Sequence, residues 1–222
     1  MKESNTLFAI YGAGGSGLSL SFFLKSNSHY SDKLNNIYFI DDDPSQISKR
    51  FVNNFPIISY TDFKSLSSSN KKILISINDV NIKSKIYEKI INDKISLWSY
   101  IDNNSIIDDS NLSPNSSYFA PFTIVNNYTE IGHCFSCNIY SYVEHESKVG
   151  NFVTFAPGVK CNGNVVIEDN VYIGSGVIIN NGNVDKKIII GKNSFVSAGT
   201  IINKSVPQNS RIIGSQRTKN VT

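Results

Sequence analysis

The sequence of 222 residues contains little cysteine and little histidine, three residues of each, and it lacks any long apolar run. Three cysteines are few and odd in number, so they do not suggest the disulfide framework of a secreted protein and fit a reducing compartment. The first residues, MKESNTLFAIYG, hold no basic segment followed by a long apolar one, and no segment approaches about 18 consecutive apolar residues. We therefore expect a cytoplasmic protein with neither a signal peptide nor a membrane span.

The sequence also lacks a strong net charge. The formal net charge of +3 at pH 7 is too small to predict a nucleic-acid partner. The basic residues are unevenly distributed, because the segment 181–222 contains a single acidic residue, Asp185, and seven basic ones: Lys186, Lys187, Lys192, Lys204, Arg211, Arg217 and Lys219. This segment is either the binding surface of a polyanionic ligand or a solvated basic surface.

The first half of the chain alternates between strand and helix patterns. Apolar, β-rich stretches at residues 6–11, 36–41, 71–77 and 94–101 predict strands, and LSLSFFLKS after the first of them suits a helix. Apolar residues at 82, 86 and 90 have the spacing of one helical face. The alternation predicts a small Rossmann-like α/β domain with a parallel sheet over residues 1–103.

A glycine-rich loop, GAGGSG, lies between the first strand and the first helix of this domain. Gly12, Gly14 and Gly17 match the pattern G-x-G-x-x-G, and Gly15 lies within it. At this place backbone N–H groups and the helix dipole can receive a phosphate. The alternative is a glycine turn that only lets the strand and the helix pack closely.

Three aspartates follow the second predicted strand. Asp41 and Asp42 lie about where an acidic residue that contacts a ribose or a base is expected. Asp43 precedes Pro44, which predicts a helix N-cap followed by proline at the first helical position, a structural role. The strand and helix alternation ends near residue 101, so a second mononucleotide-binding half is missing, and a nucleotide with one base fits better than NAD.

The second half of the chain is a repeat of six residues. Thirteen hexads run from FAPFTI at residue 119 to INKSVP at residue 202, with one break after residue 178. An apolar or small residue recurs at the first place and Val, Ser or Thr often at the fifth, which is the signature of a β-helix. Three hexads make one triangular coil of 18 residues, with the first residue of each pointing into the core. We expect an all-β domain over residues 104–222.

This register assigns roles to the cysteines and histidines. Cys137 and Cys161 occupy first places and are expected to point inward, so the C-x-x-C that Cys134 forms with Cys137 is not a redox or zinc motif. His133 and His145 are two sides of the triangle apart, so they cannot stack on one face. We expect no metal site.

The stretch EHESKVGNFVTFAPGVKCNGNVVIEDNVYIGSG, from residue 144 to residue 176, resembles the bacterial sugar acetyltransferases of the PglD and NeuD type. The resemblance covers nearly the whole chain. It implies a left-handed parallel β-helix, a homotrimer, an N-terminal domain that binds a nucleotide-linked amino sugar, and acetyl-CoA as the cosubstrate.

The resemblance also implies site residues. His145 falls on the catalytic base of the family and Glu146 on the acidic residue beside it. The glycine loop (Gly12, Gly14, Gly15 and Gly17) with Asp41 and Asp42 corresponds to the nucleotide-sugar site. The residues assigned to the coenzyme A site are Gly163, Ser175 and Ala198, and Thr154, which stands where some members place a second histidine.

The chemistry of acetyl transfer suits His145. An attacking amine must lose a proton, and imidazole, with an unperturbed pKa of about 6.5, accepts one near neutral pH. Glu146 or Glu144 can fix its tautomer, and the backbone N–H of Gly163 is a candidate donor to the thioester oxygen. Asn138 is a candidate for orienting the substrate, although an asparagine on a β-helix is more often a turn residue. The structural alternative for His145 is a solvated corner side chain.

The sequence thus predicts an acetyl-CoA-dependent N-acetyltransferase acting on a UDP-, dTDP- or GDP-linked amino sugar for bacterial surface polysaccharide or glycoprotein. Two alternatives remain open. One is a sugar O-acetyltransferase of the sialic-acid type, and the other is a non-catalytic trimeric scaffold that binds a nucleotide.

Overall fold

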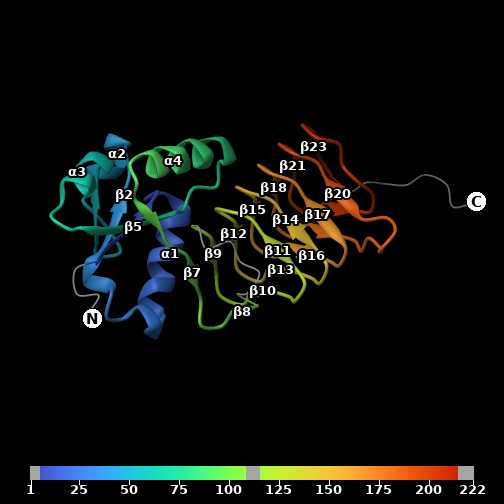
Figure 1. Ribbon diagram of the computed structural model, residues 1–222, viewed down its shortest axis with the longest axis horizontal. Helices are drawn as coiled ribbons and strands as arrows, with labels where there is room; N and C mark the ends of the chain where they lie inside the picture. Colours follow the sequence, from blue (N-terminus) through green and yellow to red (C-terminus); the bar gives the residue numbers. More distant parts are fainter. Residues whose placement is uncertain (1–5, 109–115, 215–222) are drawn as a thin grey trace, which may run out of the picture. The chain divides into compact units, whose positions relative to one another are not determined.

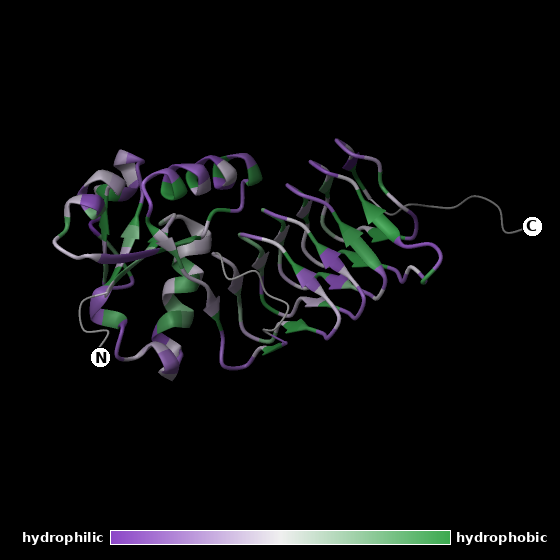
Figure 2. Ribbon diagram, viewed as in Figure 1, coloured by the Kyte–Doolittle hydropathy of each residue, from purple (hydrophilic) through white to green (hydrophobic). Residues whose placement is uncertain are grey.

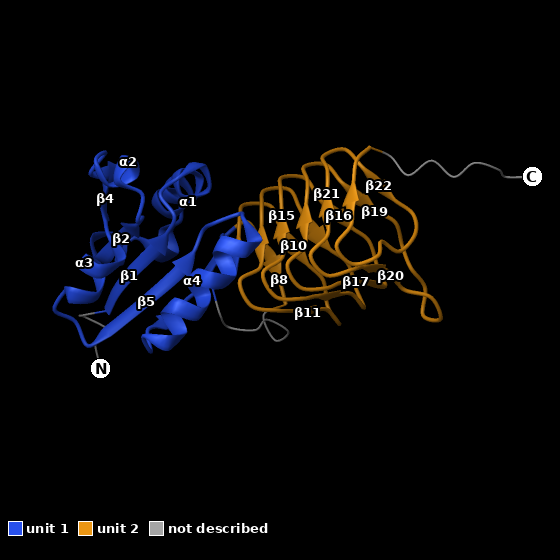
Figure 3. Cartoon of the chain, turned by 90° about the horizontal axis from the view of Figure 1, so that it is seen from above, with its two compact units in different colours: residues 1–103, 114–118 blue, residues 104–113, 119–222 orange. Residues whose placement is uncertain are grey.

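The computed structural model describes residues 6–108 and 116–214. The chain divides into two compact units, one formed by residues 1–103 and 114–118 and the other by residues 104–113 and 119–222 (Figure 3). The α-helices described lie in the first unit, and the second is built of short strands (Figure 1). Within the described ranges, no helix has the length and hydropathy needed to cross a membrane.

The first unit is built on a six-stranded sheet with the order β3-β4-β2-β1-β5-β6. Its strands are β1 (Thr6–Tyr11), β2 (Ile37–Ile40), β3 (Phe51–Val52), β4 (Phe55–Ile58), β5 (Asn70–Ile75) and β6 (Ser96–Leu97). The next strand in the chain, β7 (Tyr100–Ile101), belongs to a different sheet. All neighbours pair in parallel except β3 and β4. The sheet is buried at its centre, where Ala9, Ile10, Phe39 and Ile73 are inaccessible to solvent. The predicted parallel α/β domain is confirmed.

Four α-helices connect these strands: α1 (Gly15–Ser26), α2 (Pro44–Ile47), α3 (Tyr60–Ser65) and α4 (Val80–Asn92). Two short 3₁₀ helices, η1 (Ser28–Tyr30) and η2 (Leu34–Asn36), precede β2. Side chains cap the N-termini of three of the α-helices. Asp43 caps α2 by accepting from the backbone amide of Ser45 at 2.8 Å, and Ser59 caps α3 by accepting from the amide of Asp62. Asp79 caps α4 by accepting from the amides of Asn81 and Ile82. The N-cap prediction for Asp43 is confirmed. The predicted apolar face of α4 is only partly right, because Ile90 is buried but Ile82 is exposed.

The second unit is a parallel β-helix with three sheets, one for each side of the triangle. The β13 face contains β8 (Ile106–Ile107), β10 (Ile124–Val125), β13 (Tyr142–Val143), β16 (Lys160–Cys161), β19 (Ile178–Ile179) and β22 (Ile201–Ile202). The β14 face contains β11 (Glu130–Ile131), β14 (Lys148–Val149), β17 (Val165–Ile167) and β20 (Ile188–Ile190). The β15 face contains β9 (Tyr118–Phe119), β12 (Ser136–Cys137), β15 (Thr154–Phe155), β18 (Tyr172–Ile173), β21 (Phe195–Val196) and β23 (Arg211–Ile212). Figure 2 shows β20 as hydrophobic along its length.

The hexad register of the sequence is the register of the coils. Val143 pairs with Cys161 and Phe155 with Ile173, each one coil of 18 residues later in the chain. All thirteen first-place residues are at most 3% exposed, which confirms that they form the core. Cys137 and Cys161 are among them, and burial raises the pKa of both thiols. Stacking of the coils buries a continuous apolar column that a single coil could not bury.

The fourth place of the hexad makes the corners, because its residue adopts left-handed φ in twelve of the thirteen hexads, all but the last. The corner after the β13 face, named the His145 corner, has Tyr128, Glu146 and Asn164 at this place. The corner after the β14 face has Cys134, Phe152, Asn170 and Asn193. The corner after the β15 face, named the Gly158 corner, has Phe122, Tyr140, Gly158, Gly176 and Gly199. Asparagine and glycine tolerate this conformation best, which explains their recurrence.

Candidate active site

The glycine loop at the end of β1 divides into structural and open positions. Gly12 has φ of +114°, and a Cβ on Gly17 would lie 2.0 Å from the carbonyl oxygen of Gly12. These two glycines are therefore required by the turn and by the close approach of α1. A Cβ on Gly14 or Gly15 would meet no other atom within 4 Å, so these two border open space where the backbone can meet a ligand.

The N-terminus of α1 faces the open side of this loop without a side-chain cap. Gly14 is the N-cap residue, no side chain accepts from the first turn, and no acidic residue lies in it. A cavity of about 370 Å³ borders the loop, and its wall includes four residues that the sequence did not point to: Gln46, Lys49, Phe51 and Asn53. Phe51 is 59% exposed. The arrangement suits an anion beside the helix N-terminus with an aromatic ring nearby.

Asp41 and Asp42 both have partners within the first unit. Asp41 accepts from the amide of Ala13 at 2.9 Å, which ties the glycine loop to the end of β2. One carboxylate oxygen of Asp42 accepts from the hydroxyl of Tyr11 at 2.5 Å and from Nζ of Lys89 at 3.1 Å. The other oxygen accepts from the backbone amide of Tyr60 at 3.0 Å. Both aspartates therefore organise the loop and its neighbours, and their predicted contact with a ribose or base stays a prediction.

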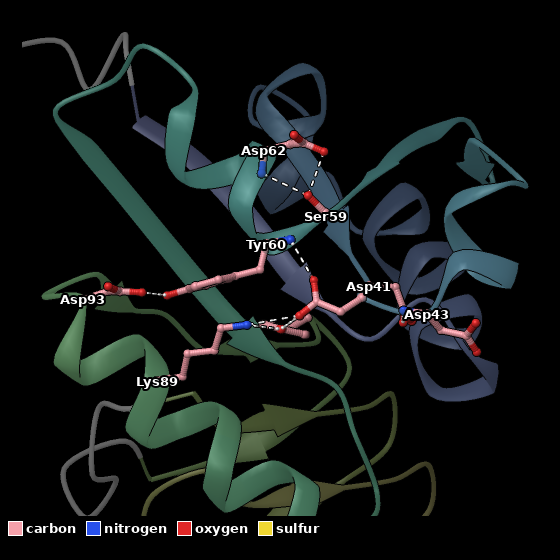
Figure 4. Close-up of polar contacts among 9 residues, drawn as sticks. Asp41, Asp43, Ser59, Tyr60, Asp62, Lys89 and Asp93 are labelled. Carbon is pink, nitrogen blue, oxygen red and sulfur yellow. Dashed lines mark hydrogen bonds and ion pairs between the residues drawn. The ribbon is translucent and has the colours of Figure 1, made fainter.

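The group around Asp42 is a compact polar cluster at the ends of β1 and β2. Lys89 of α4 lies over the ring of Tyr60, 4.1 Å from its centroid, and the hydroxyl of Tyr60 donates to Asp93 at 2.7 Å (Figure 4). Burial by itself raises the pKa of Asp42, but the donors Tyr11, Tyr60 N–H and Lys89 outweigh it and hold this pKa below its usual value. Asp42 is therefore ionised at neutral pH and links α4 to the sheet.

The second candidate site is the His145 corner of the β-helix. Nδ1 of His145 lies 3.1 Å from Oε2 of Glu146, and the two side chains are 48% and 49% exposed. Gly163 stands one coil later, directly beside the imidazole, because a Cβ at this glycine would lie 2.9 Å from Cε1 of His145. A proton on Nδ1 directed at the carboxylate leaves Nε2 as the acceptor in the neutral ring. The pair has the arrangement of a general base with an orienting carboxylate.

Two residues at this corner were missed by the sequence analysis. Asn164 donates from Nδ2 to the same oxygen of Glu146 at 3.3 Å, and Lys187 donates from Nζ to the Glu146 carbonyl at 3.3 Å. A cavity of about 320 Å³ opens here on the β14 face, and both residues line it together with Glu146. The coil period could have found Asn164, since it stands 18 residues after Glu146. Lys187 lies in the break of the repeat, where the period gives no information.

The other predicted residues lie on a different corner of the same chain. Ser175 and Ala198 are exposed at the Gly158 corner, in successive coils, where the Gly199 amide donates to the Ser175 carbonyl at 2.8 Å. Asn138 is at this corner too, and its Nδ2 donates to the Phe155 carbonyl at 2.7 Å, which is a turn role. The structure thus brings together His145, Glu146 and Gly163 but not Asn138, Ser175 and Ala198.

Thr154 requires a correction. It lies in β15 and is 0% exposed, so its side chain has no surface for a coenzyme to contact. Its strand neighbours Ser136 and Tyr172 occupy the equivalent places in adjacent coils. Residues at this place of the hexad point away from the β-helix core, and nothing in the hexad pattern indicates that this one is covered.

The basic residues of the C-terminal segment are on the surface where they are described. Lys186, Lys187, Lys192, Lys204 and Arg211 are all exposed, whereas Arg217 and Lys219 lie outside the described residues. His133 is at the corner after the β14 face and not at the His145 corner, as the period predicts. Among residues 6–108 and 116–214, no group of three or more His, Cys, Asp or Glu side chains could hold a metal ion.

Comparison with known proteins places these features in a family. Residues 8–90 match the PglD N-terminal domain. The chain is 36% identical over 215 residues to the GDP-perosamine N-acetyltransferase of Escherichia coli O157:H7, covering 94% of each chain. The chain belongs to the PglD-type sugar acetyltransferases.

Two solved structures are similar to this acetyltransferase. WeeI from Acinetobacter baumannii AYE is 34% identical with a TM-score of 0.85, covering 94% of this chain and 97% of that one. The acetyltransferase domain of PglB from Neisseria gonorrhoeae, solved with acetyl coenzyme A, has a TM-score of 0.77 at 22% identity, covering 93% and 95%. The predicted Rossmann-like domain followed by a left-handed parallel β-helix is confirmed, and so is the prediction of an acyltransferase.

Proposed function

We propose that this acetyltransferase moves the acetyl group of acetyl-CoA to the amino group of a GDP-linked amino sugar of the perosamine type. The observation that carries the proposal is the His145 and Glu146 pair beside Gly163, at an exposed corner of the β-helix. The name of the relative at 36% identity supports the GDP-linked amine as the acceptor. The acetyl coenzyme A bound to the PglB domain supports the donor.

In the proposed reaction the sugar amine attacks the thioester carbonyl and Nε2 of His145 accepts its proton. A C–N bond forms as the C–S bond breaks, and the proton passes from the imidazolium to the thiolate of coenzyme A. Glu146 orients the ring and stabilises the imidazolium through Nδ1. The backbone N–H of Gly163 is our candidate donor to the developing oxyanion.

The proposed nucleotide site is the cavity at the glycine loop. Gly14 and Gly15 leave room for the diphosphate beside the first turn of α1, where N–H groups and the helix dipole favour an anion. Phe51 offers an exposed ring in the same cavity for the base.

We also propose a homotrimer formed through the β13 face. The outward positions of this sheet are mainly apolar and partly or fully exposed: Ile106, Ile124, Tyr142, Ile178 and Ile201, with Lys160 among them. Soluble chains seldom expose so continuous an apolar surface, and a second copy of the chain has the complementary one. No other protein is required to cover it.

This assembly explains why the predicted residues occupy two corners. The β13 face is bounded by the His145 corner on one side and the Gly158 corner on the other. Around a threefold axis through this face, the His145 corner of one copy meets the Gly158 corner of the next. Ser175 and Ala198 of one chain would then bind coenzyme A beside His145 of its neighbour, and exposed Lys192, Lys204 and Arg211 would attract its phosphates.

A thiol-release assay tests the proposal. The enzyme is incubated with acetyl-CoA and one acceptor at a time. The acceptors are GDP-perosamine, UDP- and dTDP-linked amino sugars, and sialic acid, and the free coenzyme A released with each is measured. We expect release that requires the amine and is fastest with the GDP-linked sugar. Release with sialic acid alone would favour the O-acetyltransferase, and no release with any acceptor would favour the nucleotide-binding scaffold.

A further inference from the structure

We infer that Asn164 is a positioning residue, which fixes the carboxylate of Glu146 against the imidazole of His145. The inference rests on the proposed function of the His145 corner and extends it to a residue of the next coil. The juxtaposition is specific: Oε2 of Glu146 is 3.1 Å from Nδ1 of His145 and accepts from Nδ2 of Asn164 at 3.3 Å.

Asn164 is the fixed partner of this hydrogen bond and Glu146 is the more mobile one, as their solvent exposure indicates. Asn164 is 8% exposed, whereas about half of the Glu146 side chain is in contact with solvent. The backbone of Asn164 is held on both sides, because its amide donates to the His145 carbonyl at 3.2 Å and its carbonyl accepts from Ile188 at 3.3 Å. An exposed glutamate samples several rotamers, and a fixed amide donor selects the one that faces His145.

The same place at another corner shows what an asparagine does when only the turn requires it. Asn170 and Asn193 also have left-handed φ, and there the amide of Asn170 donates to the side chain of Asn193 at 3.3 Å. That bond joins two turn residues of successive coils and involves no charged group. At the His145 corner the equivalent amide is directed at a carboxylate that already contacts an imidazole.

The consequence of this contact is control of the imidazole tautomer. A carboxylate held at Nδ1 favours the ring with its proton on Nδ1 and leaves Nε2 free to accept the proton of the amine. Without the Asn164 donor, Glu146 is free to turn into solvent and the two tautomers become more equal. Asn164 touches neither reacting atom in this scheme and acts only through Glu146.

The test variant is Asn164→Gly, which keeps the left-handed φ while it removes the amide. Asn193→Gly is the matched control, since it makes the same change at a corner where the asparagine side chain is bonded to the side chains of Asn170 and Asn209. We expect kcat to fall about 3- to 10-fold in Asn164→Gly, the effect of one charge-assisted hydrogen bond partly open to water, with both KM values unchanged. In a Glu146→Gln background the same substitution should cause no further loss. An additive loss, or an equal loss in Asn193→Gly, would overturn the inference.

Nitrogen NMR of the free enzyme separates this inference from the proposed function. The chain has three histidines, so ¹⁵N-histidine labelling gives three rings, and the spectrum of His145→Ala assigns the one of interest. At about pH 8.5, where an ordinary imidazole is neutral, we expect the Nδ1–H form for His145 and a mixture of tautomers in Asn164→Gly. Unchanged tautomers would refute the positioning role. A wild type with this tautomer and no acetyl transfer would refute only the proposed function.

Discussion

The imidazole of His145 occupies its position because the next coil has no side chain at the matching place. A Cβ on Gly163 would come within 2.9 to 3.3 Å of three ring atoms. Glycine is therefore required at position 163 to leave room for the imidazole. Its backbone conformation does not require glycine, because its φ is outside the left-handed region. In a β-helix, each residue is constrained by the residue 18 positions away more than by its neighbours in sequence.

Replacing Gly163 with alanine tests this contact. The new methyl group must displace the imidazole, and the ring can turn toward solvent because it is half exposed. We expect nearly unchanged thermal stability but a fall in kcat of about 10- to 100-fold, because a general base displaced by an ångström loses its alignment with the amine. The measurement is kcat together with the melting temperature. Wild-type turnover in Gly163→Ala would show that the ring position is unimportant.

At the scale of elements, some positions of the glycine loop border the proposed binding cavity and others are required for folding. Gly14→Val should raise KM for the sugar nucleotide and leave KM for acetyl-CoA nearly unchanged, because position 14 borders open space beside the helix N-terminus. Gly17→Ala is the contrasting variant and should unfold the first unit, since its Cβ would lie 2.0 Å from the Gly12 carbonyl oxygen. Steady-state kinetics and circular dichroism of both variants check this. Equal damage to both KM values in Gly14→Val would contradict it.

The cluster around Asp42 predicts acid sensitivity of the first unit. The folded pKa of Asp42 is lowered, below the value of about 3.9 for an unfolded chain, so its contribution to stability is present above about pH 4 and is lost as the pH falls through the folded pKa. We expect the melting temperature of the helical signal to fall as the pH is lowered below about 4.

Asp42→Asn should lower this melting temperature at neutral pH and make it less dependent on pH in the acidic range. Asp32→Asn, an exposed aspartate on the same unit, is the control. Circular dichroism of the full chain reports the first unit, because the described α-helices all belong to it. An acid transition in Asp42→Asn as steep as in the wild type would show that other groups cause it.

Periodicity predicted the elements well and the polar contacts poorly. The hexads give the inward residues of all three sides, and the coil period places Gly163 beside His145. The partners of Asp42 are 18 to 47 residues away in a fold without a repeat, so no pattern indicates them. The burial of Thr154 also had no signal, because an outward place in the hexad says nothing about what covers it.

At the scale of the whole molecule, we expect three copies of the 24.6 kDa chain with active sites shared between neighbours. Ala198→Trp should block coenzyme binding at the Gly158 corner, and His145→Ala should remove the base, so each variant alone should have only a small residual activity. Co-assembled trimers should recover up to about a quarter of wild-type activity, because that fraction of corner pairs has both residues intact. A fully active enzyme that light scattering shows to be a monomer would contradict the shared site. Co-assembly of the two variants that restores no activity would also contradict it.

The turnover of His145→Ala tests the proposed chemistry most directly. Wild type and variant are compared with acetyl-CoA and the best acceptor of the panel over a range of pH, and acetyl-CoA affinity is measured by calorimetry. Loss of general-base catalysis should lower kcat about 10²- to 10⁴-fold, with the trimer and the affinity for acetyl-CoA retained and a residual rate that rises with pH. Turnover of His145→Ala close to that of the wild type would contradict the assignment and return His145 to the role of a surface residue.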